Sequence, residues 1–141
     1  MSYRILMTMA LSLTILSCHN DDDDHLTACE MSTLISSEAF ANAASDAVAI
    51  NSLEINGDCL KINFSAGGCN GNSWEIMLID SEDVLESIPA QRNLRLSLKN
   101  EELCYAYITK ELTFDISKLK VSGNSVKLNI TNSGESILYE Y

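Results

Sequence analysis

Histidine is nearly missing from this chain of 141 residues: there are two, His19 and His25, and none follows them. Nucleophile pairs of the Ser-His or Cys-His type need an imidazole as the base, and many zinc sites use one as a ligand. These chemistries are therefore excluded from residue 26 onward. The chain also has no close C-x-x-C pair for a cysteine metal site, and its glycine-rich stretch at 67–71 precedes an expected strand, unlike a phosphate-binding loop.

Basic residues are scarce as well, with nine Lys and Arg against twenty Asp and Glu, which gives a formal net charge of −11. Binding to nucleic acid or to anionic lipid headgroups depends on Lys and Arg that neutralise phosphates. The charge balance argues against both kinds of contact. We expect no nucleic-acid partner.

An apolar run of transmembrane length is lacking at the N-terminus. The run from Ile5 to Leu16 would form a helix of about 18 Å, whereas the hydrocarbon core of a bilayer is roughly 30 Å thick. The run follows one cation, Arg4, and is followed by a small residue, Ser17. This order of polar, apolar and small residues is typical of a cleaved export signal over residues 1–17.

The four residues Ile15-Leu16-Ser17-Cys18 resemble the bacterial lipobox, with Ile in place of the usual Leu. The resemblance implies that Cys18 becomes the first residue of the mature protein and carries lipid, so that the partner at this end is membrane lipid. Two or three acyl chains make a stable anchor, whereas one alone binds marginally. The alternative is an ordinary signal peptide with a chance cysteine. Cleavage would remove Arg4 and change the net charge from −11 to −12.

Residues 18–28 are expected to form a disordered, extended tether, because like charges repel there and few apolar residues are present. Its acidic residues are Asp21, Asp22, Asp23 and Asp24. An acidic cluster beside the lipid cysteine resembles the export signal that sends lipoproteins of Bacteroidota-type bacteria to the outer face of the outer membrane. A periplasm-facing anchor is the alternative. A metal site with His25 is disfavoured, because a disordered run would have to be ordered around the ion.

Residues 29–141 show repeated hydrophobic alternation of period two, which indicates half-buried β-strands. The expected strands cover residues 48–55, 60–65, 74–78, 94–98, 112–116, 126–131 and 137–141. Short turn sequences such as Asn56-Gly57-Asp58 separate them, and short connections join antiparallel neighbours. Only residues 37–45 resemble a helix. We predict one all-β domain, an antiparallel immunoglobulin-like β-sandwich of about seven strands with a short helical turn near its N-terminus.

Four cysteines remain besides Cys18, and in an exported domain they predict two disulfides with three alternative pairings. They are Cys29, Cys59, Cys69 and Cys104. Cys59 and Cys69 lie at opposite ends of one expected strand, about 20 Å apart, while a disulfide needs Cα atoms within about 7 Å. Alternating strand directions place Cys104 at the same end as Cys69. The favoured pairs are therefore Cys69 with Cys104 and Cys29 with Cys59.

Two classes of function suit these features. The first is a surface binding module for a protein or glycan, with contacts from the loops at 67–73 and 79–92, since sandwiches present function on loops. The candidate contact residues are Asn70, Asn72, Trp74, Asp80, Glu82, Asp83, Gln91 and Arg92. The second is an inhibitor of extracellular hydrolases, which a small disulfide-bonded domain without catalytic histidine could be.

A hydrolase that uses a carboxylate pair is a third, less favoured class. Its candidate residues are Glu82, Asp83, Glu86, Glu101, Glu102 and Glu111. Weak Ca²⁺ binding by Asp80, Glu82 and Asp83 is the less favoured interpretation of this segment, and a polar loop is the favoured one. We expect no enzyme, no cofactor and no metal. The segments 57–60, 68–75 and 87–92 are similar to those of small uncharacterised Bacteroidota lipoproteins, which implies a compartment and a fold but no activity.

Overall fold

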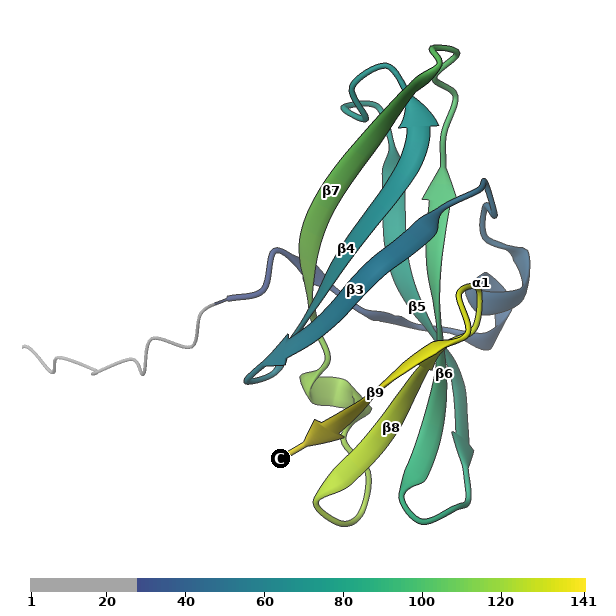
Figure 1. The fold of residues 1–141 in the computed structure, drawn as a ribbon. Helices are drawn as coiled ribbons and strands as arrows, with labels where there is room; N and C mark the ends of the chain where they lie inside the picture. Colours follow the sequence, from purple (N-terminus) through teal and green to yellow (C-terminus); the bar gives the residue numbers. More distant parts are fainter. Residues whose placement is uncertain (1–27) are drawn as a thin grey trace, which may run out of the picture.

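The computed structural model describes residues 28–141 (Figure 1). The expected signal peptide at 1–17 and the lipid-bearing Cys18 lie outside this part, as do the acidic residues Asp21, Asp22, Asp23 and Asp24. Within residues 28–141 there is no helix with both the length and the apolar character needed to cross a bilayer.

More than half of the described residues lie in strands. The elements in chain order are β1 (Met31–Ser32), β2 (Leu34–Ile35), α1 (Ser37–Asn42), β3 (Ala49–Asn56), β4 (Cys59–Gly68), β5 (Glu75–Leu85), β6 (Ala90–Lys99), β7 (Ala106–Asp115), the 3₁₀ turn η1 (Ser117–Leu119), β8 (Ser125–Ile130) and β9 (Glu135–Glu140). β1 and β2 have two residues each, so seven longer strands, β3 to β9, build the fold.

Two sheets face each other across the core (Figure 1). Sheet A has the strand order β1-β7-β4-β3, and sheet B has the order β2-β5-β6-β8-β9. The all-β fold of two sheets, with about seven main strands and a short helix near the N-terminus, is confirmed. The expectation that every pairing is antiparallel is wrong, because both sheets are mixed.

Three strand pairs are parallel: β1 with β7, β2 with β5, and β6 with β8. The β6–β8 pair has a clear cause in the path of the chain. After β6 the chain crosses to sheet A, forms β7 and η1, and only then returns to sheet B as β8. A crossover of this length permits parallel pairing. The consecutive pairs β3–β4, β5–β6 and β8–β9 are antiparallel, as short connections require.

The core follows from the period-two alternation, because every second side chain of a strand points to the same face. Leu60, Ile62 and Phe64 of β4 are fully buried between the sheets. The other buried apolar residues include Leu78, Leu94, Leu96, Leu98, Phe114, Ile116, Leu119, Val126, Leu128, Ile130 and Tyr139. Each large apolar side chain buried in this way contributes roughly 1.5–3 kcal/mol.

The segment from Met31 to Ile35 holds both sheets together along one side. β1 pairs with β7 of sheet A, and β2, one residue later, pairs with β5 of sheet B. Helix α1 follows directly, with the Ser36 hydroxyl accepting a hydrogen bond from the Ala39 N–H at 3.1 Å as its N-cap. The helix packs against β5.

Candidate interaction surface

The two loops that were expected to bind lie at opposite ends of the sandwich (Figure 1). The connection between β4 and β5 lies at the end where β7 begins. Residues 79–92 are mostly not a loop: β5 continues to Leu85 and β6 begins at Ala90, so these residues form a hairpin at the other end. The structure therefore does not bring the two sets of candidate residues into one site.

Three of the candidate contact residues are buried, and their expected role at a surface is wrong. Asp80 and Arg92 face the core, where Arg92 Nε lies 3.2 Å from Asp80 Oδ2 as an ion pair. These two atoms are close but not aligned as a hydrogen bond. Burial raises the pKa of the Asp80 carboxyl, and the Arg92 charge opposes that rise. Trp74 packs near Phe64, with 6.4 Å between ring centroids.

Most of the other candidates make local hydrogen bonds. The Glu82 carboxylate accepts from the Ser37 N–H at 3.0 Å, and this bond lowers the pKa of Glu82. Gln91 donates to the Ser87 hydroxyl at 3.0 Å. Asn70 Oδ1 accepts from the Asn72 N–H at 2.9 Å. Asp83 lies exposed on β5. These contacts shape turns and a strand bulge, and they form no convergent binding site.

Both disulfides pair the cysteines as strand direction predicts. The Cα atoms are 5.6 Å apart in Cys29–Cys59 and 4.8 Å apart in Cys69–Cys104, within the range that a disulfide requires. Cys69–Cys104 joins the β4–β5 connection to the β6–β7 connection. Each of these connections passes from one sheet to the other, so this disulfide fixes the end of the sandwich where they meet.

The Glu102 carboxylate is hydrogen-bonded to four residues of the β4–β5 connection. Its Oε2 atom accepts from the backbone N–H groups of Cys69, Asn70 and Gly71 at 2.5, 3.1 and 3.0 Å, and its Oε1 atom accepts from the Ser73 hydroxyl at 2.9 Å. Successive N–H groups that converge in this way form an anion-binding nest. Desolvation raises the pKa of Glu102, but these hydrogen bonds outweigh it and lower that pKa from 4.5 to about 2. The carboxylate is therefore a structural anchor.

Further contacts make this end rigid. Lys110 Nζ donates to the Gly71 carbonyl at 2.6 Å and lies 5.5 Å from the centre of the Trp74 ring. Gly71 has a φ of 70°, and a Cβ there would lie 2.6 Å from Lys110 Cε, so the position favours glycine. Asn100 donates to the Gly67 carbonyl at 2.6 Å and accepts from the Glu102 N–H at 3.0 Å.

Beside this rigid end lies an exposed apolar strip, which we call the tyrosine surface and define as Leu103, Tyr105 and Tyr107. Their exposed fractions are 90%, 104% and 69%. Leu103 and Tyr105 lie in the connection that leads into β7, and Tyr107 lies in the strand itself. Tyr107 also lines a shallow groove with Ser65 and Gly67. The residues of the tyrosine surface were not among the contact residues expected from the sequence, although their period-two spacing around Cys104 is visible there.

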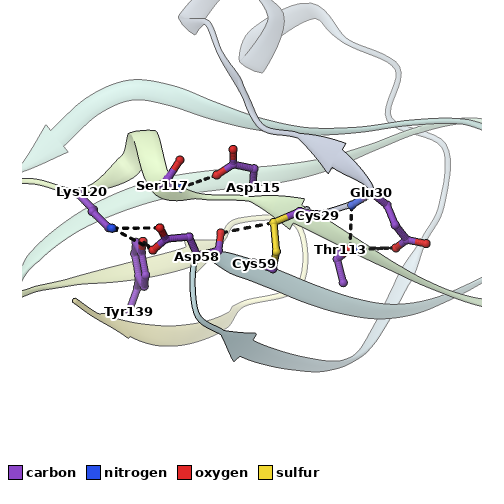
Figure 2. Close-up of a disulfide and its surroundings, with 9 residues drawn as sticks. All are labelled: Cys29, Glu30, Asp58, Cys59, Thr113, Asp115, Ser117, Lys120 and Tyr139. Atoms are coloured by element: carbon purple, nitrogen blue, oxygen red, sulfur yellow. Dashed lines mark hydrogen bonds and ion pairs between the residues drawn. A yellow bond between two sulfur atoms is a disulfide. The ribbon is translucent and has the colours of Figure 1, made fainter. Parts of the chain in front are cut away.

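The region of the other disulfide, Cys29–Cys59, is held by side-chain contacts of Asp58 (Figure 2). Asp58 accepts a short hydrogen bond from the Tyr139 hydroxyl and pairs with Lys120 Nζ at 2.9 Å. These two partners lower the pKa of Asp58, while burial, followed by the Asp58 contact, raises the pKa of Tyr139. The Cys29 sulfur lies 3.7 Å from the Asp58 carbonyl oxygen, but a disulfide sulfur carries no proton, so this contact is not a hydrogen bond.

The acidic residues of the hydrolase hypothesis do not gather in one place. Glu102 lies at the end of the sandwich that carries Cys69–Cys104, whereas Glu82 and Glu86 belong to the β5–β6 hairpin at the opposite end. Within residues 28–141, no group of three or more His, Cys, Asp or Glu side chains is placed to hold a metal ion.

No protein-family model and no curated protein matches the chain. Solved structures share its fold. A NigD-like immunity protein from Bacteroides caccae has a TM-score of 0.54 at 14% identity, and the match covers 77% of this chain and 58% of that one. A protein of unknown function from Bacteroides vulgatus, DUF1344, has a TM-score of 0.51 at 14% identity, with 79% and 56% covered.

A toxin-related protein from Parabacteroides distasonis has a TM-score of 0.52 at 16% identity, and the match covers 79% of this chain and 60% of that one. The chain thus matches less than two thirds of the length of each of these proteins. At such identities the likeness establishes the fold. The genera agree with the resemblance to small Bacteroidota proteins that the sequence suggested.

Proposed function

We propose that this chain is a lipid-anchored, extracytoplasmic binding protein that recognises a protein partner through the tyrosine surface. The observation that carries the proposal is the exposure of Leu103, Tyr105 and Tyr107 beside a segment fixed by a disulfide and by Glu102. Aromatic side chains contribute strongly when a partner covers them, because they bring a large area with few rotatable bonds. A surface that is already ordered loses little conformational entropy on binding.

A partner-capture experiment tests this proposal. Tyr105→Ser together with Tyr107→Ser removes both rings, and Ile88→Ser is the matched control, because Ile88 is 104% exposed at the opposite end of the sandwich. The full-length proteins are expressed in the source bacterium and cross-linked in intact cells. We expect the recovered partner to fall about tenfold with the double variant, equivalent to about 1.4 kcal/mol, and to be unchanged with Ile88→Ser. Equal recovery from all three proteins would refute the assignment.

A more specific form of the proposal is an immunity-like role, in which the partner is a toxin. It rests on the two structural neighbours described as a NigD-like immunity protein and a toxin-related protein. Cells that lack the chain should then survive poorly in mixed culture with toxin-producing neighbours, and the wild-type chain should restore survival. Failure of the double tyrosine variant to restore survival would connect the role to the tyrosine surface. Unchanged survival without the chain would exclude it.

An inhibitor of extracellular hydrolases is the related alternative. It predicts stoichiometric loss of activity for one member of a protease panel. We further propose that the chain is not an enzyme, because two of the candidate carboxylates, Glu82 and Glu102, make structural hydrogen bonds to the backbone. Turnover in a glycan or ester hydrolysis screen would contradict this.

The proposed anchor is Cys18, and the proposed location is the outer face of the outer membrane, through Asp21, Asp22, Asp23 and Asp24. Mass spectrometry of the N-terminal peptide should find an acylated Cys18, and Cys18→Ser should release the protein from membranes. Protease treatment of intact cells should remove the domain. Survival of the domain in intact cells, with digestion after lysis, would favour a periplasm-facing anchor.

A further inference from the structure

Strand β7 lies next to the edge of sheet A, and most of its outer side has no neighbouring strand (Figure 1). β4 pairs with β7 along its whole length, from Ala106 to Asp115. On the other side β1 pairs only with Phe114 and Asp115. Within residues 28–141, no strand therefore covers this side of β7 from Ala106 to Leu112. An uncovered edge of this length is a template for another strand.

The direction of the backbone groups on this edge follows from two contacts. The Thr113 N–H donates to Glu30 Oε2 at 2.8 Å, on the side where β1 lies (Figure 2). The Ile116 N–H donates to the Asp58 carbonyl at 2.9 Å, on the opposite side. Since backbone groups alternate in direction along a strand, the N–H and C=O groups of Tyr107, Thr109 and Glu111 point, like that of Thr113, to the open edge.

The side chains beside this edge indicate what kind of strand would fit. Ile108 and Leu112 face the inside of the sandwich and are half-buried, and Lys110 between them is bonded to the Gly71 carbonyl, so an added strand would place apolar side chains next to Ile108 and Leu112. Tyr107 and Glu111 face outward and are exposed, so its alternate residues would meet a ring and a carboxylate. The described residues also carry sixteen acidic and eight basic side chains in total. An extended segment that alternates apolar and basic residues is complementary to this edge.

We propose that the partner adds a β-strand to β7, as an extended segment with alternating apolar and basic residues, bonded to the backbone of Tyr107, Thr109 and Glu111. This inference rests on the proposed binding function and specifies how the partner would bind. The added strand would run past Tyr107 toward Tyr105 and would cover the tyrosine surface as well. A second copy of this chain is a poorer occupant, because it would bring a second Glu111 and the same net negative charge to the interface.

Amide hydrogen exchange of the isotope-labelled full-length protein tests the open edge directly. The N–H groups of Ile108, Lys110 and Leu112 should exchange slowly, since they point to β4, and those of Tyr107, Thr109 and Glu111 should exchange at least about tenfold faster. Addition of a short synthetic peptide of alternating valine and lysine should slow the fast set. If the N–H groups of Tyr107, Thr109 and Glu111 exchanged slowly without peptide, and more slowly at higher protein concentration, a second copy of the chain would occupy the edge. That result would overturn the proposal.

Proline at the centre of the edge separates backbone binding from side-chain binding. Thr109→Pro removes one backbone donor, the N–H that points to the open edge. Thr109→Val is the control, because both changes lose the hydroxyl contact with Ser65 but valine keeps the N–H. We expect Thr109→Pro to weaken binding of the valine-lysine peptide by about tenfold and Thr109→Val to leave it within about twofold. Equal effects of both variants, or equally tight binding of a valine-glutamate peptide, would overturn the proposal.

These outcomes are distinct from those of the proposed function. Tyr105→Ser tests the tyrosine surface without altering the backbone of β7. Loss of partner capture in this variant with normal binding by Thr109→Pro would keep the binding function and refute strand addition. Peptide binding that depends on Thr109 but not on Tyr105 would keep strand addition and refute the tyrosine surface.

Discussion

The two disulfide regions contain similar residues but differ in what their carboxylates contact and in which side chains they expose. Each has a carboxylate with a lowered pKa beside the disulfide, Asp58 near Cys29–Cys59 and Glu102 near Cys69–Cys104. Asp58 accepts a hydrogen bond from Tyr139 of β9 and forms an ion pair with Lys120, which follows η1. Glu102 bonds the backbone of a neighbouring connection, and the residues that follow it expose apolar side chains.

This difference agrees with our proposal of a binding role for the tyrosine surface and a structural role for the Asp58 region. In the Asp58 region, Lys120 lies over the rings of Tyr139 and Tyr141, at 5.9 and 5.6 Å from their centres. In the Glu102 region, Lys110 lies over the Trp74 ring, whereas no cation among residues 28–141 lies over Tyr105, which is fully exposed. Solvent-exposed apolar area beside a rigid frame is typical of an interaction site.

Removal of either disulfide should have the largest effect on stability. We expect Cys29→Ala/Cys59→Ala and Cys69→Ala/Cys104→Ala each to lower the free energy of unfolding by about 2–5 kcal/mol. The two losses should be similar, because the sequence separations are 30 and 35 residues. Urea denaturation measures both. Only the second variant should also lose partner binding, measured where it is still folded; equal loss of binding in both would erase the contrast between the regions.

The Asp58 region should respond to loss of a single hydroxyl. Tyr139→Phe removes the hydrogen bond to Asp58 and leaves the ring in the core, which should cost about 1.5 kcal/mol, the lower end for a bond to a charged group, since Asp58 is partly exposed and keeps Lys120. Tyr141→Phe is the control, because its hydroxyl bonds the Val121 backbone near solvent; it should cost about 0.5 kcal/mol. Equal losses of unfolding free energy in the two variants would mean that the bond to Asp58 stabilises the fold no more than the bond to the Val121 backbone.

The sequence could predict the disulfides because strand direction alternates along the chain whichever sheet a strand joins. Cys69 and Cys104 follow strands that run toward the same end, and this holds although β4 and β6 belong to different sheets. The sequence could not predict the β6–β8 pair. Alternation of apolar residues shows which face of a strand is buried, but it does not show which strand lies next to it.

The candidate site was harder to predict, for physical reasons that particular residues illustrate. Trp74 follows glycines and asparagines typical of a loop, yet the turn at Gly71 directs its ring against Phe64. Asp80 and Arg92 are charged, and their burial is compensated by their ion pair and by the Glu82 N–H, which donates to Asp80. Leu103 and Tyr105 have large, mainly apolar side chains typical of a core, yet both are exposed. They follow Glu102, whose backbone partners lie about thirty positions earlier in the chain.

Acid should destabilise the Glu102 region in a defined pH range. A carboxylate whose folded pKa is below its unfolded value stabilises the fold above the unfolded pKa, and this contribution is lost as pH falls through the folded pKa. For Glu102 the range runs from 4.5 down to about 2. Glu102→Gln should therefore flatten the fall of Tm across this range, whereas the exposed Glu101→Gln should not. An unchanged profile in Glu102→Gln would show that the nest does not hold the carboxylate in solution.

The smallest expected effect on stability belongs to the tyrosine surface. Tyr105→Ser with Tyr107→Ser should change the free energy of unfolding by no more than about 0.5 kcal/mol, because exposed side chains away from caps and cores contribute little. The same variant should bind less of a hydrophobic dye and should lose the partner. This combination separates a binding surface from a packing surface. A loss above about 1 kcal/mol would mean that the rings support the fold, and the two disulfide regions would then differ in exposure but not in purpose.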